Sequence, residues 1–171
     1  MVSKFKMTLA LAVAAIPLPV FAALGGDVSS IAADQNQLSA TVTQLSAVPL
    51  QADVSANNAG GTTLPLPAGV TVQQLTQADG TVIREYIAAG KVFGIAWTAP
   101  QPPNLSQLLG NYFQSYVTAV QNASSKGAVH GPLTIQADGL VVHTSGHMNA
   151  FRGQAFLLKS LPQGVTGQAI R

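Results

Sequence analysis

The stretch from Val70 to Pro100, "VTVQQLTQADGTVIREYIAAGKVFGIAWTAP", decides the fold. It is rich in β-branched and aromatic residues, which favour strands. Asp79-Gly80 is a strong signal for a two-residue hairpin turn, because both central positions of such a turn favour positive φ. Ala89-Gly90 is a weaker second turn signal. The stretch therefore predicts three antiparallel strands near 70–77, 82–88 and 91–98.

Two-residue turns would set the register of this meander and so assign its side chains to faces. One face then collects Leu75, Val82, Arg84, Tyr86, Phe93, Ile95 and Trp97, and the other collects Val70, Val72, Ile83, Ile87, Val92, Gly94 and Ala96, with Gln74 opposite Glu85. Neither face is polar, whereas a meander with one face in water shows a polar face. We therefore expect both faces to contact something.

A helix follows the meander. Asn104 is a suitable N-cap, and Gln107 three residues later completes a variant of the capping box. Apolar residues then recur at helical spacing: Leu105, Leu108, Leu109, Tyr112, Phe113, Tyr116, Val117 and Val120. This spacing predicts an amphipathic helix over 105–122, and its aromatic stripe is interpreted as core packing rather than as a ligand site.

The segment from Gly131 to Pro162 has the same pattern of strand and turn signals as the meander. The tetrapeptide "QADG" occurs at 77–80 and again at 136–139, which favours hairpins at both places. Strands are predicted near 132–136, 139–145 and 149–158, and the chain after them is interpreted as loop.

The segments before the meander complete the fold prediction. Alternation over 38–43 is typical of a strand, and Asp27 suits the N-cap of a short helix over 28–36. Residues 48–69, rich in Pro, Gly and Asn, are interpreted as a flexible loop. We expect a single α+β domain over 23–171: a mainly antiparallel sheet of about six strands, with the 105–122 helix packed on one face and a short N-terminal helix.

The first 22 residues have the pattern of a secretory signal peptide. Lys4 and Lys6 precede an uncharged run, "MTLALAVAAIPLPVFA", which is shorter than the roughly 20 residues of a membrane span and ends in a site for cleavage after Ala22. No later run is long enough to span a bilayer. We expect the mature chain in the periplasm or outside the cell.

Charge excludes some partners and favours others. The whole chain has 8 Lys+Arg and 6 Asp+Glu. Removing Lys4 and Lys6 leaves 6 against 6, so the mature chain has no net charge and no basic character to suggest nucleic acid. Only 8% of residues are charged, against about 25% in typical domains. This low charge favours a protein partner or self-association.

Two histidines, His143 and His147, are four residues apart, a spacing that suits zinc ligands on a helix. Here they fall on a predicted strand and beyond a turn, and His130 is the only other histidine. We interpret them as polar residues of a hairpin and expect neither a metal nor another cofactor.

The remaining candidates are charged or aromatic residues of the meanders. Glu85, the only glutamate, would need a partner if buried, such as Arg152, Lys91 or a histidine. Arg84 is able to stack on an aromatic ring such as Trp97. No cysteine and no G-x-S-x-G motif is present. The candidate binding residues are Arg84, Glu85, Trp97, His143, His147 and Arg152, with no catalytic residue assigned.

Several segments together resemble the domain of unknown function 2844 family, small exported proteins of proteobacteria: "ALGGD", "PNLSQLLGNYF" and "GLVVHTSGHMNAFRGQAF". The resemblance runs from Ala23 to about Pro162, with the 48–69 loop longer than the family pattern. It implies an exported single domain and carries over no catalytic residue.

Two functions remain open. The first is a non-catalytic periplasmic or secreted protein that binds a partner or itself. The alternative is a small metal-binding protein or enzyme using His143, His147, Arg152 and Glu85.

Overall fold

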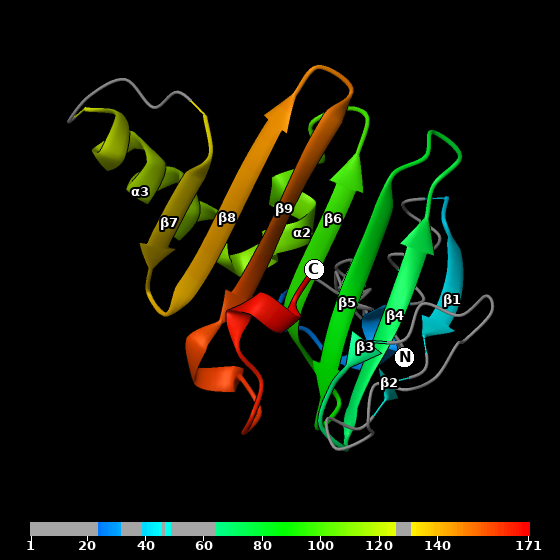
Figure 1. Cartoon of the computed structure of the whole chain (residues 1–171). Helices are drawn as coiled ribbons and strands as arrows, with labels where there is room; N and C mark the ends of the chain where they lie inside the picture. Colours follow the sequence, from blue (N-terminus) through cyan, green and yellow to red (C-terminus); the bar gives the residue numbers. More distant parts are fainter. Residues whose placement is uncertain (1–23, 32–38, 46, 49–63, 126–130) are drawn as a thin grey trace, which may run out of the picture.

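A computed structural model describes residues 24–31, 39–45, 47–48, 64–125 and 131–171. The predicted signal peptide and most of the predicted 48–69 loop lie outside the described residues, as does His130. The chain forms one large antiparallel sheet with helices on one side and the C-terminal segment on the other (Figure 1). The predicted α+β class is confirmed.

The large sheet has seven strands, rather than about six. Their spatial order is β1 (Thr41–Leu45), β4 (Val70–Thr76), β5 (Val82–Ala88), β6 (Lys91–Ala99), β9 (Ala150–Leu157), β8 (Leu140–His147) and β7 (Leu133–Ala137). The strand predicted over 38–43 forms as β1, a few residues later than expected, and it adds to the edge because its Val42 pairs with Leu75 and packs against the core. A separate parallel pair joins β2 (Ala47–Val48) and β3 (Leu64–Pro65).

Two three-stranded meanders build most of this sheet. β4, β5 and β6 form the first, β7, β8 and β9 form the second, and the last strand of each pairs antiparallel with the other. Each meander contains one of the two "QADG" turns. The strands predicted from both turns are confirmed within one or two residues.

The faces predicted for the first meander are wrong, because the register is shifted by one residue at two points. The turn at Asp79-Gly80 spans three residues, with Gln77 N donating to Thr81 O at 2.9 Å. Gln74 therefore lies opposite Arg84 and not Glu85. A β-bulge then places Tyr86 opposite Gly94. Each shift moves the following side chains to the other face.

The helical layer follows the prediction with one interruption. It consists of α2 (Leu105–Leu109), a 3-10 turn η2 (Gly110–Tyr112) and α3 (Phe113–Ser124). Gly110 has φ +50°, which ends α2 and breaks the predicted continuous helix. Asn104 caps α2 as expected, accepting from Ser106 N at 3.1 Å. None of the described helices is long and apolar enough to cross a membrane.

The short N-terminal helix predicted over 28–36 is not seen. Of that range, Val28–Ser30 form only the 3-10 turn η1, and residues 32–38 lie outside the described chain. The segment before it pairs its backbone with the start of β6, through Gly25 N to Val92 O at 2.8 Å and Val92 N to Gly26 O at 3.0 Å. Asp27 forms a bridge with Lys91 instead of capping through its side chain.

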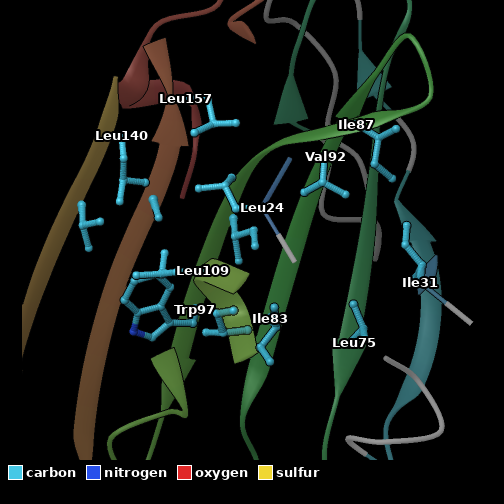
Figure 2. Packing of buried hydrophobic residues seen from close by; sticks show 14 of the residues in the cluster. Leu24, Ile31, Leu75, Ile83, Ile87, Val92, Trp97, Leu109, Leu140 and Leu157 are labelled. Atoms are coloured by element: carbon cyan, nitrogen blue, oxygen red, sulfur yellow. The ribbon is translucent and has the colours of Figure 1, made fainter. Parts of the chain in front are cut away.

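The main core lies between the sheet and the helices. Figure 2 shows part of it, with Trp97 and Ile83 from the sheet close to Leu109 of α2. Leu24 and Ile31 of the N-terminal segment join the same cluster. Burying each large aliphatic side chain contributes roughly 1.5–3 kcal/mol, so this layer is the principal source of stability.

A second core lies on the opposite side, where the C-terminal segment crosses the sheet. This segment contains two 3-10 turns, η3 (Leu158–Ser160) and η4 (Gly167–Ala169). Its Ile170 is fully buried and rests on Gly94, which has no side chain to block it. Val165 joins Tyr86, Phe93 and other residues in the same cluster. The tail predicted as loop is thus a structural cover.

Candidate functional site

The strand register assigns each sheet residue to a face, because residues directly opposite in neighbouring strands point to the same side. The face with Ile83 and Trp97 packs against the helices and is called the helix face. The face with Arg84 and Tyr86 is called the open face, since only part of it is covered.

Two neighbouring cross-strand rows of the open face are mostly polar, and we call them the polar rows. The first row is Thr43, Gln74, Arg84, Ala96, Gln154, His143 and Thr134. The second row is Thr41, Thr76, Val82, Thr98, Arg152 and Ser145. They lie toward the upper ends of β5, β6, β9 and β8 in Figure 1, and the end of the red C-terminal segment, marked C, reaches their border.

The next row along the strands is apolar, and the C-terminal segment covers it. This row contains Leu45, Val72, Tyr86, Gly94, Phe156 and Val141. The open face therefore changes from a polar, uncovered half to an apolar, covered half within one strand length.

A cleft of about 660 Å³ opens beside the polar rows. Its lining includes Arg84, Thr134, His143, Arg152 and Gln154 from those rows, together with Arg171 from the C-terminal segment. Clefts that hold small organic ligands measure about 300–1,000 Å³, so this one is large enough for such a ligand.

Arg84 is held in place by two hydrogen bonds. Its Nε donates to Gln74 Oε1 at 3.0 Å, and its Nη1 donates to the main-chain oxygen of Arg171 at 2.9 Å. Among the described residues, nothing accepts a hydrogen bond from Nη2. One edge of the guanidinium is thus committed to the fold, and the other remains available to a ligand.

Tyr86 fixes the end of the C-terminal segment next to Arg84. Its hydroxyl donates to the main-chain oxygen of Arg171 at 2.7 Å and accepts from Arg171 N, 2.9 Å away. Burial raises the pKa of the Tyr86 phenol above its usual 10.0, while the hydrogen bond with Arg171 and the nearby guanidinium groups act to lower it. The phenol is therefore neutral and able to donate at neutral pH.

His143 stands at the other side of the cleft. Its Nδ1 lies 2.8 Å from Thr134 Oγ1, and its ring packs 6.1 Å from the ring of Phe156. These contacts set the plane of the imidazole. Nε2 has no hydrogen-bond partner in the part of the chain that the structure describes, so it too is available to a ligand.

Arg152 is the most open of the cationic groups. It lies opposite Thr98 on β6 and Ser145 on β8, and its side chain is exposed. Within the described ranges it makes no side-chain hydrogen bond or ion pair. Asp79 borders a neighbouring hollow with Arg152, but its carboxylate accepts from Thr81 N at 2.8 Å and Thr81 Oγ1 at 3.0 Å.

The cleft concentrates positive charge. Three arginines and a histidine line it, and none of the described residues in its lining is Asp or Glu. Asp27 lies 3.5 Å from Lys91 at the β5–β6 turn, and Asp138 accepts from Ser115 at the β7–β8 turn. Of the acidic side chains that the structure describes, Asp27, Glu85 and Asp138 thus lie away from this cleft, and Asp79 borders the neighbouring hollow.

The structure brings together three of the six predicted site residues. Arg84, His143 and Arg152 share the cleft. Trp97 borders it but is only 4% exposed, with its ring in the helix-face core.

The other two lie elsewhere. Glu85 is 2% exposed on the helix face, opposite Ile95 and separated from the cleft by the sheet. His147 is exposed at the end of β8, where its Nδ1 lies 3.3 Å from Met148 O. His143, His147, Arg152 and Glu85 therefore do not form one constellation. No three His, Cys, Asp or Glu side chains of the described residues are grouped closely enough to hold a metal ion.

Sequence reasoning missed Gln74, Thr134, Gln154 and Arg171. The first three are ordinary polar residues that acquire a role only through their row, which depends on register. Arg171 reaches the cleft only because the C-terminal segment folds back over the sheet.

Comparison with known proteins identifies a family. A family model described as "Protein of unknown function (DUF2844)" matches residues 20–170. Neither the curated proteins nor the solved structures give a significant match.

Proposed function

The chain belongs to the domain of unknown function 2844 (DUF2844) family, and we propose that it is an exported, non-catalytic protein that binds a small ligand in the cleft beside the polar rows.

One observation carries this proposal: half of the open face is polar, uncovered and hollowed, while the other half is closed by the chain itself. A sheet face that only meets water needs no oriented side chains. Here Arg84 and His143 are both held by hydrogen bonds, with donor or acceptor atoms left over. Convergent polar groups in a preformed hollow are typical of a binding site.

The cleft offers little for catalysis. Acid–base chemistry usually employs two titratable groups with separated pKa values. The described lining of the cleft holds one histidine, His143, and no Asp, Glu or Cys that could act with it. Glu85, the carboxylate of the alternative enzyme hypothesis, lies on the other face.

Export is part of the proposal and rests on the first 22 residues. Intact-mass measurement of the protein recovered from the periplasm or the medium tests it. The expected mass is that of a chain beginning at Ala23. A chain that retains Met1 and stays in the cytoplasm contradicts export.

The expected binding surface is also narrower than the sequence suggested. Apolar residues on both faces of the first meander suggested that something covers each face. The helices and the chain's own C-terminal segment supply those covers. We therefore place the binding surface at the cleft, and light scattering on the mature chain tests whether self-association occurs as well.

Backbone NMR spectra of the mature chain test the binding role without assuming a ligand class. The titrated compounds are a set of neutral, cationic and anionic small molecules. We expect at least one to shift the amides of Thr98, Gly153 and Gln154, while those at the β5–β6 turn, such as Gly90, stay unchanged. Absence of any shift around the cleft, or shifts confined to the helix face, contradicts the role.

A further inference from the structure

Resting on this binding role, we propose that the cleft takes a small organic anion that carries at least two oxyanion groups, carboxylate or phosphate. The juxtaposition that points to it is Arg84, Arg152 and Arg171 around one hollow whose described lining has no Asp or Glu side chain.

The chemistry of the lining selects for acceptors. Guanidinium groups have only donors, and their fork matches the geometry of carboxylate and phosphate. Hydrogen bonds to such anions are charge-assisted and roughly twice as strong as neutral ones. Gln154 and Thr134 add neutral donors at the same hollow. A cationic ligand would be repelled by the like charge of the three arginines that line the cleft.

The spacing of the arginines calls for more than one anionic group. Arg84 on β5 and Arg152 on β9 are separated by β6, and their partners on β6, Ala96 and Thr98, are two residues apart. With strands about 4.8 Å apart and a rise of about 3.3 Å per residue, the two Cα atoms are roughly 12 Å apart.

The direction of Arg84 strengthens this requirement. Its hydrogen bond to Gln74 draws the guanidinium toward β4, which is away from Arg152. The two guanidinium groups therefore do not close on a single oxyanion. A ligand that satisfies both must carry its oxyanion groups at separate positions.

The two arginines have different tasks. Arg84 is preorganised by Gln74 and the main-chain oxygen of Arg171, so it loses little side-chain freedom when a ligand binds. Arg152 makes no hydrogen bond among the described residues and would order on the ligand. Gln74 is thus a positioning residue: its loss should weaken binding less than loss of Arg84.

Calorimetric titration of the purified mature chain at low salt tests the proposal. The probes are citrate and pyrophosphate, with acetate as the single-group comparison. We expect citrate or pyrophosphate to bind at least roughly tenfold more tightly than acetate. Preference between citrate and pyrophosphate distinguishes a carboxylate ligand from a phosphate ligand.

Charge-matched variants locate the site. Arg152→Ala should weaken the tighter probe by roughly tenfold or more. Lys159→Ala removes one positive charge from an exposed position outside the cleft and should leave affinity unchanged. Arg84→Lys keeps the charge but not the fork, and should also weaken binding. Thermal melts of each variant confirm that it is folded.

Two results overturn the inference: neither probe binds better than acetate, or Lys159→Ala weakens binding as much as Arg152→Ala. If neutral compounds shift the cleft amides in the NMR titration while no anion binds, the binding role stands and the anion inference fails. If no compound of any class reaches the cleft, both fail.

Discussion

At the scale of single residues, the cleft depends on a close contact that a methyl group would break. A Cβ added at Gly153 would lie 2.2 Å from Cζ2 of Trp97 and 2.6 Å from the main-chain oxygen of His143. Backbone atoms of a central strand cannot yield as a flexible side chain does. The Trp97 ring and β8 therefore set how closely β9 is packed beneath the cleft.

Gly153→Ala should lower the free energy of unfolding by about 1–3 kcal/mol, the usual cost of overpacking. Gly94→Ala is the matched control, because its added Cβ would meet Cδ1 of Ile170 at 2.7 Å, the far end of a side chain that is able to shift. Urea denaturation of both variants measures the difference. Equal losses would show that the Trp97 contact is not the limiting one.

Tyr86→Phe should cost about 1–3 kcal/mol of unfolding free energy near neutral pH, because Arg171 N and its main-chain oxygen lose a buried partner. The cost should shrink at alkaline pH. The folded pKa of Tyr86 is raised above the unfolded value near 10.0, so its stabilising contribution is complete below pH 10 and is lost as the pH rises through the folded pKa.

Urea denaturation of both proteins near neutral pH and above about pH 10 checks the Tyr86 effect. The wild-type protein should lose more stability than Tyr86→Phe over this range. Tyr116, whose pKa burial also raises, is present in both proteins and cancels in the comparison. If the difference in unfolding free energy between the wild-type protein and Tyr86→Phe stays constant or widens as the pH rises, the assigned role of the Tyr86 phenol is contradicted.

The chemical type of a residue predicted its place in the site better than its predicted place in the sheet did. Arg84, His143 and Arg152 were predicted as candidates from their chemistry, and all three line the cleft. Glu85 was grouped with them but lies on the other face, where it is buried. Arg84 and Glu85 are neighbours in β5, and successive side chains of a strand point to opposite faces, so only one of the two is able to reach the cleft.

At the scale of elements, segments with a local signal were predictable. Asp-Gly turns identified both meanders, and apolar spacing identified the helical layer. Of the N-terminal helix predicted over 28–36, the structure describes only the 3-10 turn Val28–Ser30 and Ile31, so most of that prediction lies outside the described residues. The C-terminal cover was missed because Val165 and Ile170 follow neither a helical nor a strand period.

Asn104 was predicted from the sequence as a helix N-cap, and its contribution to the stability of α2 can be measured. Asn104 Oδ1 accepts from Ser106 N at 3.1 Å and from Ser106 Oγ at 2.6 Å. Asn104→Ala should lower the unfolding free energy by about 0.5–2 kcal/mol. Asn111→Ala, at an exposed position within η2, is the matched control and should have a smaller effect in the same urea titration.

An equal effect of Asn104→Ala and Asn111→Ala would mean that the cap is not what holds α2. The second half of the predicted capping box, Gln107, does not make the hydrogen bond that the motif predicts. Gln107 Nε2 is buried and has no hydrogen-bond partner among the described residues. The motif therefore identified the start of the helix correctly without specifying every contact.

At the scale of the whole molecule, the sheet is covered unevenly, and this unevenness creates the site. Helices cover one face, while the C-terminal segment covers only the apolar row of the other. The polar rows stay open, with the end of the segment at their border through Arg171. A chain in which only 8% of the residues are charged thus gathers three arginines at one hollow.

Removal of residues 162–171 should therefore both lower the free energy of unfolding and promote association of the chain. Val72, Phe93 and Phe156 lose their cover, and an apolar patch on an otherwise charge-poor surface promotes association. Ile170→Ala, which empties one fully buried site, should cost about 2–5 kcal/mol without exposing the whole row. Leu158→Ala, at a side chain that is 42% exposed, should cost less than Ile170→Ala.

Light scattering at several protein concentrations, with urea denaturation on the same samples, separates these effects. The truncated chain should associate more than the full chain, and Ile170→Ala should lose stability while keeping the association state of the full chain. Circular dichroism verifies that the truncated sheet still forms. A truncated chain that is as stable and as dispersed as the full one would mean that the segment does not close the apolar row in solution, and the division of the open face into a closed and a binding half would then fail with it.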